Sequence, residues 1–565
     1  MGSSIHVLSR GLLLAALAPI LWWAPAGQSS AAQAVTVQLL AINDLHGNLE
    51  PRSGPSASIE GVPAGGVEYL ATHLARDAAE NPNTLIVAAG DLIGASPLLS
   101  ALFHDEPTVA AVNAMHLAIS SVGNHEFDKG WRELVRMQTG GCHPFDGCRG
   151  TDSYAGAQYS YLSANVVRRR EDGSTAPLFS PTAVRTIGGV KIGFIGETLR
   201  NTPQMVTAAG VRDLTFLDEA STANRYAAEL KRAGVHAIVL LLHQGGYQTR
   251  TDAGDPNACA DFHGAILPIL RRLSPDIRVV VSGHSHQAYV CTIQGRSVTS
   301  AASFGRVITR LNLTVDPATD TIRQVAARNE VVTRDVPKDE DQSRILATYL
   351  PVAKPLADRV VGSISADLTR TANDAGESSL GDVIADAQLA AASAPDKGGA
   401  VVALMNPGGI RVDIPLVEGT ASQRASGTVT YGRLFAVQPF SNTLTVVTLT
   451  GDALRRVLEQ QFHVSGSATM LQVSNGFSYA YRRIADPGRH VDPASMRVNG
   501  VRIAPGTRVR VVTSDFLVDG GDGFTVLSEG THRTAAGPDI DALEAYFKLH
   551  SPVAPGPQDR VVLIQ

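Results

Sequence analysis

The sequence has few aromatic and few charged residues, and neither sign of charge dominates it. Aromatic residues make up 5% of the chain and charged residues 18%, with 48 Lys and Arg against 53 Asp and Glu. The formal net charge of −5 excludes a global basic field that would attract a polynucleotide through its phosphates. With 44% hydrophobic residues, wholesale disorder is excluded and 565 residues suffice for more than one core.

Long hydrophobic runs are also missing, apart from one near the N-terminus. The uncharged run from Gly11 to Ala26 is too short for a membrane span, which needs roughly 20 apolar residues. The small residues of Ala32-Gln33-Ala34 offer a cleavage site, so residues 1–34 are predicted to be a signal peptide. Cleavage after Ala24-Pro25-Ala26 and an uncleaved anchor are the alternatives. We expect an exported protein, periplasmic or extracellular, with no stable membrane span.

Cysteine is scarce, and the absence of a CxxC pair argues against a zinc ribbon or a redox motif. Four cysteines behind an export signal favour disulfide bonds, with free thiols in a reducing compartment as the alternative. The turn-forming residues between Cys142 and Cys148 favour that pair, which leaves Cys259 to pair with Cys291.

The first half of the chain alternates strand-like and helix-like stretches, as layered α/β proteins do. Apolar runs predict strands at 35–42, 84–89, 118–122, 190–195, 237–242 and 277–281. Polar clusters follow these strands, and ligands in such sheets bind beyond the carboxyl ends of the strands. A charged helical stretch at 335–357 is predicted to connect this half to a second domain.

Five segments place oxygen or imidazole ligands directly after an apolar strand. They are Asp44-Leu45-His46, Gly90-Asp91, Gly123-Asn124-His125-Glu126, His243 and Gly283-His284-Ser285-His286. Asp44 and His46 are two residues apart, so an extended backbone would point both side chains to one side. Such ligands without thiolate suit Mn²⁺, Zn²⁺, Co²⁺ or Mg²⁺, and two ions could clamp the oxygens of an in-line displacement. The pattern therefore predicts phosphate-ester hydrolysis.

In order and spacing, these segments and the following Phe127-Asp128 resemble the calcineurin-like metallophosphoesterases in their 5′-nucleotidase branch. The resemblance implies two metal ions and attack of a metal-activated water on phosphorus. One ion would be held by Asp44, His46, Asp91 and His286. The other would be held by Asp91, Asn124, His243 and His284. The resemblance also assigns a catalytic dyad to His125 and Asp128, in which the carboxylate orients the imidazole and favours its charged form.

Four later segments resemble the C-terminal nucleotidase domain of the same family, which implies that this domain holds the nucleoside. They are 377–387, 406–411, 438–442 and 516–524. Two aromatic residues could stack on a base, an aspartate could accept from ribose hydroxyls, and an arginine suits phosphate. The predicted substrate-binding residues are Asn124, Arg370, Asn406, Gly408, Gly409, Arg411, Phe440, Phe516 and Asp522.

The second domain also departs from the family pattern. Gly376 stands where some relatives carry an arginine that reaches phosphate, and Arg370 is predicted to replace it. Pro407 stands where a glycine more often follows the asparagine at 406. These differences weaken any inference about which nucleotide is preferred.

The predicted architecture is a layered metallophosphoesterase β-sandwich with flanking helices (35–334), the connector (335–357) and an α+β nucleotidase domain (358–565). The predicted activity removes the 5′-phosphate from nucleoside monophosphates such as AMP, a small-molecule substrate, and no polynucleotide is expected. The first alternatives share the same site: a UDP-sugar or dinucleotide pyrophosphohydrolase, or a 2′,3′-cyclic-nucleotide phosphodiesterase. The second is a nucleotide-binding protein without turnover.

Overall fold

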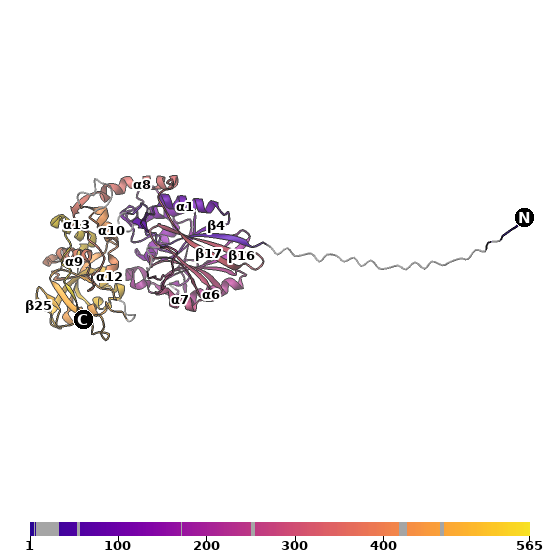
Figure 1. Cartoon of the computed structure of the whole chain (residues 1–565). Helices are drawn as coiled ribbons and strands as arrows, with labels where there is room; N and C mark the ends of the chain where they lie inside the picture. The colour runs from indigo at the N-terminus through magenta and orange to yellow at the C-terminus, as the bar shows by residue number, and fades with distance from the viewer. Residues whose placement is uncertain are drawn as a thin grey trace.

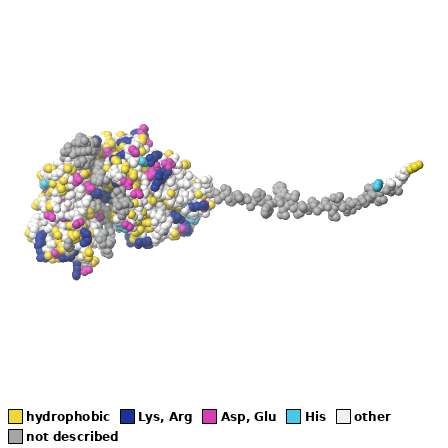
Figure 2. All heavy atoms as spheres, viewed as in Figure 1, with side chains coloured by type: hydrophobic (Ala, Val, Ile, Leu, Met, Phe, Trp, Pro, Cys, Tyr) yellow, Lys and Arg dark blue, Asp and Glu magenta, His cyan; other side chains and the backbone are white. Residues whose placement is uncertain are grey.

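The computed structural model describes residues 1–4, 6, 33–52, 57–170, 172–249, 255–416, 427–463 and 468–564. The predicted signal peptide lies almost entirely outside the described residues. The described parts of the chain form two α/β bodies that lie side by side, with helix α8 (Glu340–Ala357) along one edge (Figure 1). Basic and acidic side chains are interspersed on the face seen in Figure 2, as the small net charge leads one to expect.

The N-terminal body is a sandwich of two six-stranded sheets, ordered β17-β16-β1-β4-β5-β6 and β14-β15-β13-β12-β10-β9. The strands are β1 (Val35–Ile42), β4 (Thr84–Ala88), β5 (Leu117–Ser121), β6 (Ser160–Leu162), β9 (Thr182–Ile187), β10 (Val190–Thr198), β12 (Ala237–His243), β13 (Ile277–Ser282), β14 (Ala288–Ile293), β15 (Arg296–Ala301), β16 (Val307–Asp316) and β17 (Thr321–Val331). Strands β1, β4, β5 and β6 pair in parallel, as do β10, β12, β13 and β15. Their carboxyl ends therefore meet at common sheet edges.

The alternation of apolar residues along the strands explains the layers. In β1, Val37 and Leu39 pack into the core between the two sheets, whereas Leu40 and Ile42 join the core under the outer helices. Helix α1 (Val67–Ala79) covers that outer face, and helices α6 (Glu219–Arg232) and α7 (Ile266–Arg272) cover the other sheet. The predicted sandwich with flanking helices is thus confirmed.

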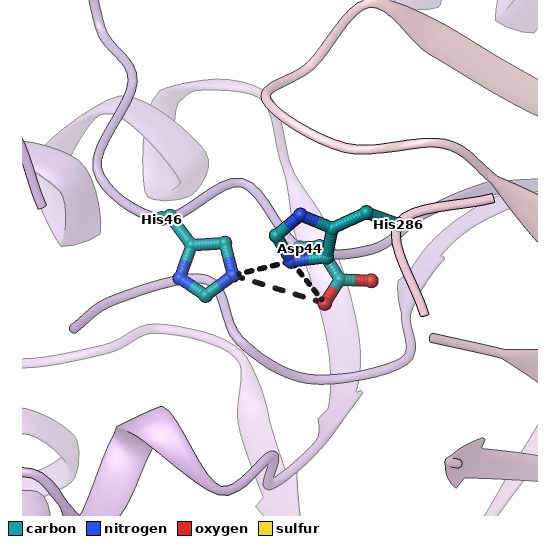
Figure 3. A group of neighbouring side chains, drawn as sticks. All are labelled: Asp44, His46 and His286. Carbon is teal, nitrogen blue, oxygen red and sulfur yellow. Dashed lines mark hydrogen bonds and ion pairs between the residues drawn. The ribbon is translucent and has the colours of Figure 1, made fainter. Parts of the chain in front are cut away.

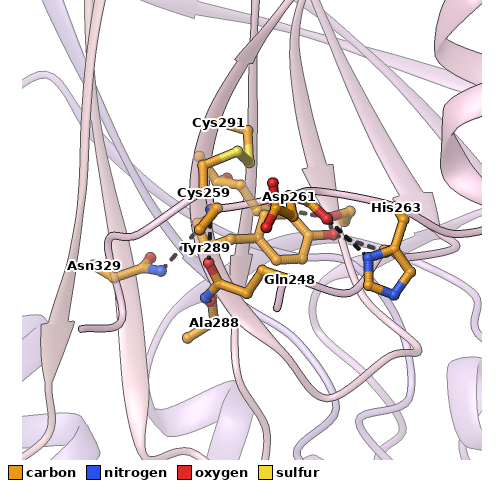
Figure 4. The surroundings of a disulfide bond; sticks show 12 residues. Gln248, Cys259, Asp261, His263, Ala288, Tyr289, Cys291 and Asn329 are labelled. Carbon is orange, nitrogen blue, oxygen red and sulfur yellow. Dashed lines mark hydrogen bonds between the residues drawn. A yellow bond between two sulfur atoms is a disulfide. The ribbon is translucent and has the colours of Figure 1, made fainter. Parts of the chain in front are cut away.

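Two disulfide bonds tie loops of the N-terminal body, and they are the pairs that the sequence favoured. They join Cys142 to Cys148 and Cys259 to Cys291. The second bond fastens a loop to β14, beside Tyr289 (Figure 4). In the same place Gln248 Nε2 donates to the Ala288 carbonyl at 2.9 Å, and Asn329 Nδ2 donates to the Pro256 carbonyl at 2.8 Å. Side-chain hydrogen bonds and a covalent link therefore hold this loop together.

The C-terminal body is built on a five-stranded sheet, ordered β22-β19-β26-β21-β27. Its strands are β19 (Val402–Met405), β21 (Thr443–Thr450), β22 (Gln472–Val473), β26 (Arg508–Ser514) and β27 (Thr531–Pro538). Helices α9 (Ser379–Ala392) and α13 (Asp539–His550) cover one face of this sheet, and helix α11 (Gly451–Glu459) covers the other. A second sheet, β25-β24-β23-β28, contains β23 (Phe477–Arg482), β24 (Arg497–Val498), β25 (Val501–Arg502) and β28 (Val561–Ile564). The two-domain α/β architecture is thus confirmed.

Helix α8 follows the last strand of the sandwich and precedes the C-terminal sheet. Its buried Leu346 and Tyr349 belong to the core of the N-terminal body, and Gln342 Nε2 donates to the Ala111 carbonyl at 2.9 Å. The Asp339 side chain caps its N-terminus by accepting from the Gln342 backbone amide. We therefore keep 335–357 as the proposed connector. Across the described ranges, none of the helices combines the length and the apolar composition that crossing a bilayer requires.

Candidate active site

The predicted metal ligands converge where the parallel strands of both sheets end. Asp44 follows β1, Asp91 follows β4, and Asn124 follows β5, while His243 is the last residue of β12 and His284 follows β13. Apart from a partly buried His284, these side chains are buried. Segments spread over more than 200 residues thus contribute to one site, because parallel strands share an edge at their carboxyl ends.

The first group of ligands is Asp44, His46 and His286 (Figure 3). His46 Nδ1 lies 2.9 Å from the Gly94 carbonyl, which can only accept, so Nδ1 carries the proton and Nε2 presents a lone pair. His46 Nε2 lies 3.0 Å from His286 Nε2 and 3.8 Å from Asp44 Oδ1, and His286 Nε2 lies 3.4 Å from that same oxygen. Two ring nitrogens and a carboxylate oxygen therefore face one another.

The second group is Asp91, His243 and His284, with Asn124 beside it. His243 Nδ1 donates to the Ala89 carbonyl at 2.7 Å, which turns Nε2 toward Asp91 Oδ2 at 2.9 Å. Burial opposes the charged form of His243, but the charge of Asp91 outweighs it and raises the pKa of His243 to about 10. His284 Nδ1 lies 3.0 Å from Asn124 Oδ1.

Asp91 lies between the two groups. Its Oδ2 is 2.9 Å from His243 Nε2 and 3.7 Å from His46 Nε2. Burial opposes ionisation of Asp91, but the charge of His243 outweighs it and holds the pKa of this carboxyl well below its usual range. Burial likewise lowers the pKa of His46 well below its ordinary value. Buried carboxylate oxygens and imidazole nitrogens that face one another fit divalent cations, and the cluster holds no thiolate to favour softer metals.

The backbone at several of these ligands adopts left-handed conformations and not the extended one that was expected. Asp44 and His46 have φ values of 50° and 47°, and His284 and His286 have values of 70° and 55°. Asp91 also has a positive φ, of 50°. The expectation of an extended backbone is therefore wrong: tight left-handed turns direct the ligands inward. Such residues cost on the order of 1–3 kcal/mol each and concentrate at functional sites.

Glu126 is a positioning residue that the sequence reasoning left without a role. Its carboxyl oxygens accept from the backbone amides of Asp91 at 2.8 Å, Leu92 at 2.8 Å and Gly123 at 2.6 Å. Burial, with the charge of Asp91, raises its pKa to about 8. A side chain at Gly123 would collide with Asp91. Glu126 thus ties two ligand loops together, and its place inside the Gly123-Asn124-His125-Glu126 motif could have drawn attention to it.

The predicted dyad is formed. His125 opens a short 3₁₀ helix, η2 (His125–Phe127), and its Nδ1 lies 2.9 Å from Asp128 Oδ2. Asp128 Oδ2 also accepts from the Ala95 amide at 3.1 Å, which holds the carboxylate in place. Burial lowers the pKa of His125, but the charge of Asp128 outweighs it and raises the pKa above its ordinary value. Since Nδ1 faces Asp128, Nε2 remains for another group.

A cavity of about 390 Å³ lies between the two bodies and joins the dyad to the predicted nucleoside-binding residues. The residues lining it include Asn124, His125, Asp128, Lys129, His284, Asn406, Gly408, Gly409, Arg411, Phe440, Phe516 and Asp522. Lys129 Nζ donates to the Phe440 carbonyl at 3.1 Å, and the rings of Phe440 and His125 stack with centroids 5.7 Å apart. Asn406 Nδ2 donates to Asp522 Oδ2 at 2.6 Å.

Arg370 lies outside that cavity, in a neighbouring one of about 250 Å³. His286 and Arg411 line this second cavity together with Arg52 and Arg306, which no motif had indicated. Arg370 Nε lies 3.2 Å from Asp413 Oδ1. The second cavity thus brings four guanidinium groups to the edge of the ligand cluster.

Gly376 does not leave room for the arginine that some relatives carry at that position. It has a φ of 92°, and an added Cβ would meet the side chain of Met470. Arginine at 376 would therefore need a rearrangement of the loop, whereas Arg370 already lines a cavity beside the ligand cluster.

Comparison with known proteins agrees with this architecture. The family model described as calcineurin-like phosphoesterase matches residues 37–288, and the model of the 5′-nucleotidase C-terminal domain matches residues 360–529. Cell wall protein Lmo0130 of Listeria monocytogenes is 33% identical over 92% of this chain, which spans 68% of that protein. Endonuclease YhcR of Bacillus subtilis is 30% identical over 95% of this chain, which spans 42% of that protein.

A solved structure shows the same fold over nearly the whole chain. The 5′-nucleotidase precursor of Thermus thermophilus superimposes with a TM-score of 0.76 at 27% identity, covering 94% of this chain and 99% of that one. Both bodies are therefore shared with that structure, and the cavity lies where the two bodies meet.

Proposed function

The chain belongs to the family of metal-dependent 5′-nucleotidases, phosphoesterases with a calcineurin-like domain and a C-terminal nucleotidase domain, and on that premise we propose that it removes the 5′-phosphate from nucleoside monophosphates such as AMP. The observation that carries the proposal is the cavity in which His125 and two members of the ligand cluster, Asn124 and His284, face Phe440 and Phe516 of the other body. A nucleotide bound in this cavity could place its phosphate at the metal ligands and its base against the two rings.

Two divalent cations are proposed at the ligand cluster. Asp44, His46 and His286 would hold one, and His243, His284 and Asn124 the other, with Asp91 contributing to both. When bound, the cations would supply Lewis-acid chemistry that polarises a phosphoryl oxygen and eases deprotonation of water.

The protein side chains have distinct tasks in this proposal. Asp128 fixes His125 so that Nε2 faces the cavity, where the imidazolium can stabilise charge or give a proton to the leaving 5′-oxygen. Arg411 lines the cavity and suits a bidentate contact with phosphate. Phe440 and Phe516 would stack on the base, a contact worth roughly 1–3 kcal/mol.

The arginine-lined cavity favours a second candidate with the same site. Four arginines, including Arg370, line it next to His286, and a second phosphate or a sugar phosphate would suit their charge. A UDP-sugar or dinucleotide pyrophosphohydrolase is therefore the alternative activity. A 2′,3′-cyclic-nucleotide phosphodiesterase would need the same metal ligands, but its substrate has no second phosphate to bind in the arginine-lined cavity.

Export is part of the proposal. Two disulfides form within the described residues, which is typical of proteins in oxidising compartments, and one relative is named a cell wall protein. Mass spectrometry of the mature N-terminus after expression should show a chain that begins at Val35. A chain that keeps residues 1–34 in the cell would contradict the export proposal.

A substrate panel tests the proposed activity. Purified mature protein, supplied with Mn²⁺, Zn²⁺, Co²⁺ or Mg²⁺ singly, should release phosphate faster from AMP than from ADP, UDP-glucose or 2′,3′-cyclic AMP. A preference for UDP-glucose would favour the alternative. Single-stranded DNA belongs in the panel because one relative is named an endonuclease. If no substrate turned over with any metal, the second alternative, a nucleotide-binding protein without turnover, would be favoured over an enzyme.

A further inference from the structure

A second cluster of metal-ligating side chains lies outside the active site, around the small disulfide loop. His104, Glu133 and His143 each offer a ligand atom, and these atoms lie within 4.8 Å of one another. The three residues come from separate segments: the turn that follows helix α2 (Leu98–Ala101), helix α4 (Trp131–Thr139) and the loop closed by Cys142–Cys148. All three are partly buried.

The two histidines are held together and share an acidic neighbour. Their rings stack in parallel, with centroids 3.7 Å apart and planes 10° apart. His104 Nε2 lies 2.8 Å from Asp146 Oδ2, and His143 Nδ1 accepts from the Asp146 backbone amide at 3.2 Å, which leaves His143 Nε2 to face other groups. Burial, together with the charge of His143, lowers the pKa of His104. A neutral imidazole beside carboxylates is the form that binds metal ions.

Acidic and basic side chains surround the cluster and pair with one another. Arg136 donates to both oxygens of Glu133, at 2.7 and 2.9 Å, and to Glu106 at 2.7 Å, while Arg149 donates to Asp146 at 3.2 Å. Three carboxylates thus face two guanidinium groups and two imidazoles. The other oxygen of Glu106 is buried and has no hydrogen-bond partner among the described residues.

We propose that His104, Glu133 and His143, with Asp146 as a fourth ligand, form a zinc site separate from the active site. Tetrahedral zinc with bonds of roughly 2.0–2.1 Å keeps its ligand atoms about 3.3 Å apart, so rotations of these side chains bring them into place. Two imidazoles and carboxylates suit Zn²⁺ better than Mg²⁺ or Ca²⁺, which prefer oxygen ligands alone. The ion would fasten the 142–148 loop to helix α4 and to the turn at His104.

The position of the site gives the ion a role near the dyad. His104 and Glu133 line one part of a small cavity of about 90 Å³, and His125 and Asp128 line another part of it. An ion held by His104 and Glu133 would therefore steady the wall that they form beside the dyad without touching a reacting group.

Zinc stoichiometry tests the proposal directly. The full-length protein, freed of metal by chelation, is saturated with Zn²⁺, separated from free ion and analysed by mass spectrometry for zinc per chain. The double variant His104→Ala/His143→Ala should hold one zinc fewer than the wild type, and excess Mg²⁺ should not displace that zinc. His236→Ala, which removes an exposed histidine elsewhere, is the matched control and should bind as the wild type does.

Two further variants keep the test decisive. Asp91→Asn/His243→Ala should lower the zinc count through the active site while leaving the additional zinc in place, which separates the two sites. If the His104→Ala/His143→Ala variant fails to fold by circular dichroism, His143→Gln alone replaces it, and zinc should still be lost. If a folded His104→Ala/His143→Ala or His143→Gln variant held as much zinc per chain as the wild type, the proposal would be overturned.

Discussion

At the scale of single residues, the site depends on which atom each histidine turns toward it. His46 and His243 each give Nδ1 to a backbone carbonyl, so both present Nε2 to the ligand cluster. His125 gives Nδ1 to Asp128 instead, and its protonated form is favoured. Histidines a few ångströms apart are thereby separated into residues that turn Nε2 toward the ligand cluster and a residue that is paired with Asp128 and can donate a proton.

Replacing His125 should affect turnover far more than metal binding. With His125→Ala, kcat for AMP should fall about 100- to 1,000-fold, because general acid catalysis by a positioned histidine contributes typically 10²–10⁴-fold. Steady-state kinetics combined with metal analysis checks both quantities. His236→Ala should keep wild-type kcat. A His125→Ala protein that lost its metals together with its activity would place this residue among the ligands instead.

At the scale of secondary-structure elements, helix α9 carries a buried acid, Asp382, whose charge is only weakly compensated. Neither Asp382 side-chain oxygen has a hydrogen-bond partner among the described residues, and Arg560 pairs with Asp386 at 2.8 Å while staying 3.9 Å from Asp382 Oδ1. Burial raises the pKa of Asp382 to about 7, against the pull of Arg560. The fold therefore favours its protonated form.

This acid should make stability depend on pH. Between about pH 4 and 7 the native state keeps a proton that the unfolded chain has released, so the free energy of unfolding falls as pH rises. Asp382→Asn removes this pH-dependent loss of stability. The free energy of unfolding of the variant, relative to that of the wild type, should therefore be up to about 2–4 kcal/mol higher above pH 7 than at pH 4. Urea unfolding across this range measures it.

The control for this experiment is Asp541→Asn, which changes an exposed acid in helix α13. Its difference from wild type should stay constant with pH. Parallel pH profiles for Asp382→Asn and the wild type would show that Asp382 is ionised in the folded protein.

Elements were the most predictable level of the structure. The strands predicted at 35–42 and 237–242 match β1 and β12, since apolar periodicity is set by local sequence. The left-handed turns at Asp44 and His286 could not be predicted, because non-glycine residues adopt positive φ only under tertiary constraint. Arg52 and Arg306 reach their cavity through folding alone, so no motif could indicate them.

At the scale of the whole molecule, the proposed reaction is divided between two bodies. The N-terminal body carries the metal ligands and His125, and the C-terminal body carries Phe440 and Phe516 in the same cavity. Lys129 bridges them by donating to the Phe440 carbonyl. Binding of the nucleoside and cleavage of the phosphate should therefore respond separately to mutation.

Loss of a stacking ring should weaken substrate binding more than turnover. Phe516→Ala should raise KM for AMP about 5- to 100-fold, in line with roughly 1–3 kcal/mol per stacked base, and change kcat less. Initial rates over a range of AMP concentrations separate the two constants. Phe145→Ala is the control, since that ring is 92% exposed. An unchanged KM in Phe516→Ala would show that the base binds elsewhere.

The most direct test of the whole account is phosphate release from AMP by metal-depleted protein as divalent ions are restored, with Asp91→Asn measured in parallel. Asp91 lies between both ligand groups, so its loss should impair both proposed metal positions. The wild type should be inactive after chelation and recover when metal is added, and Asp91→Asn should stay at least 1,000-fold slower at every metal concentration. Full activity in chelator, or recovery of Asp91→Asn to the wild-type rate, would contradict the account.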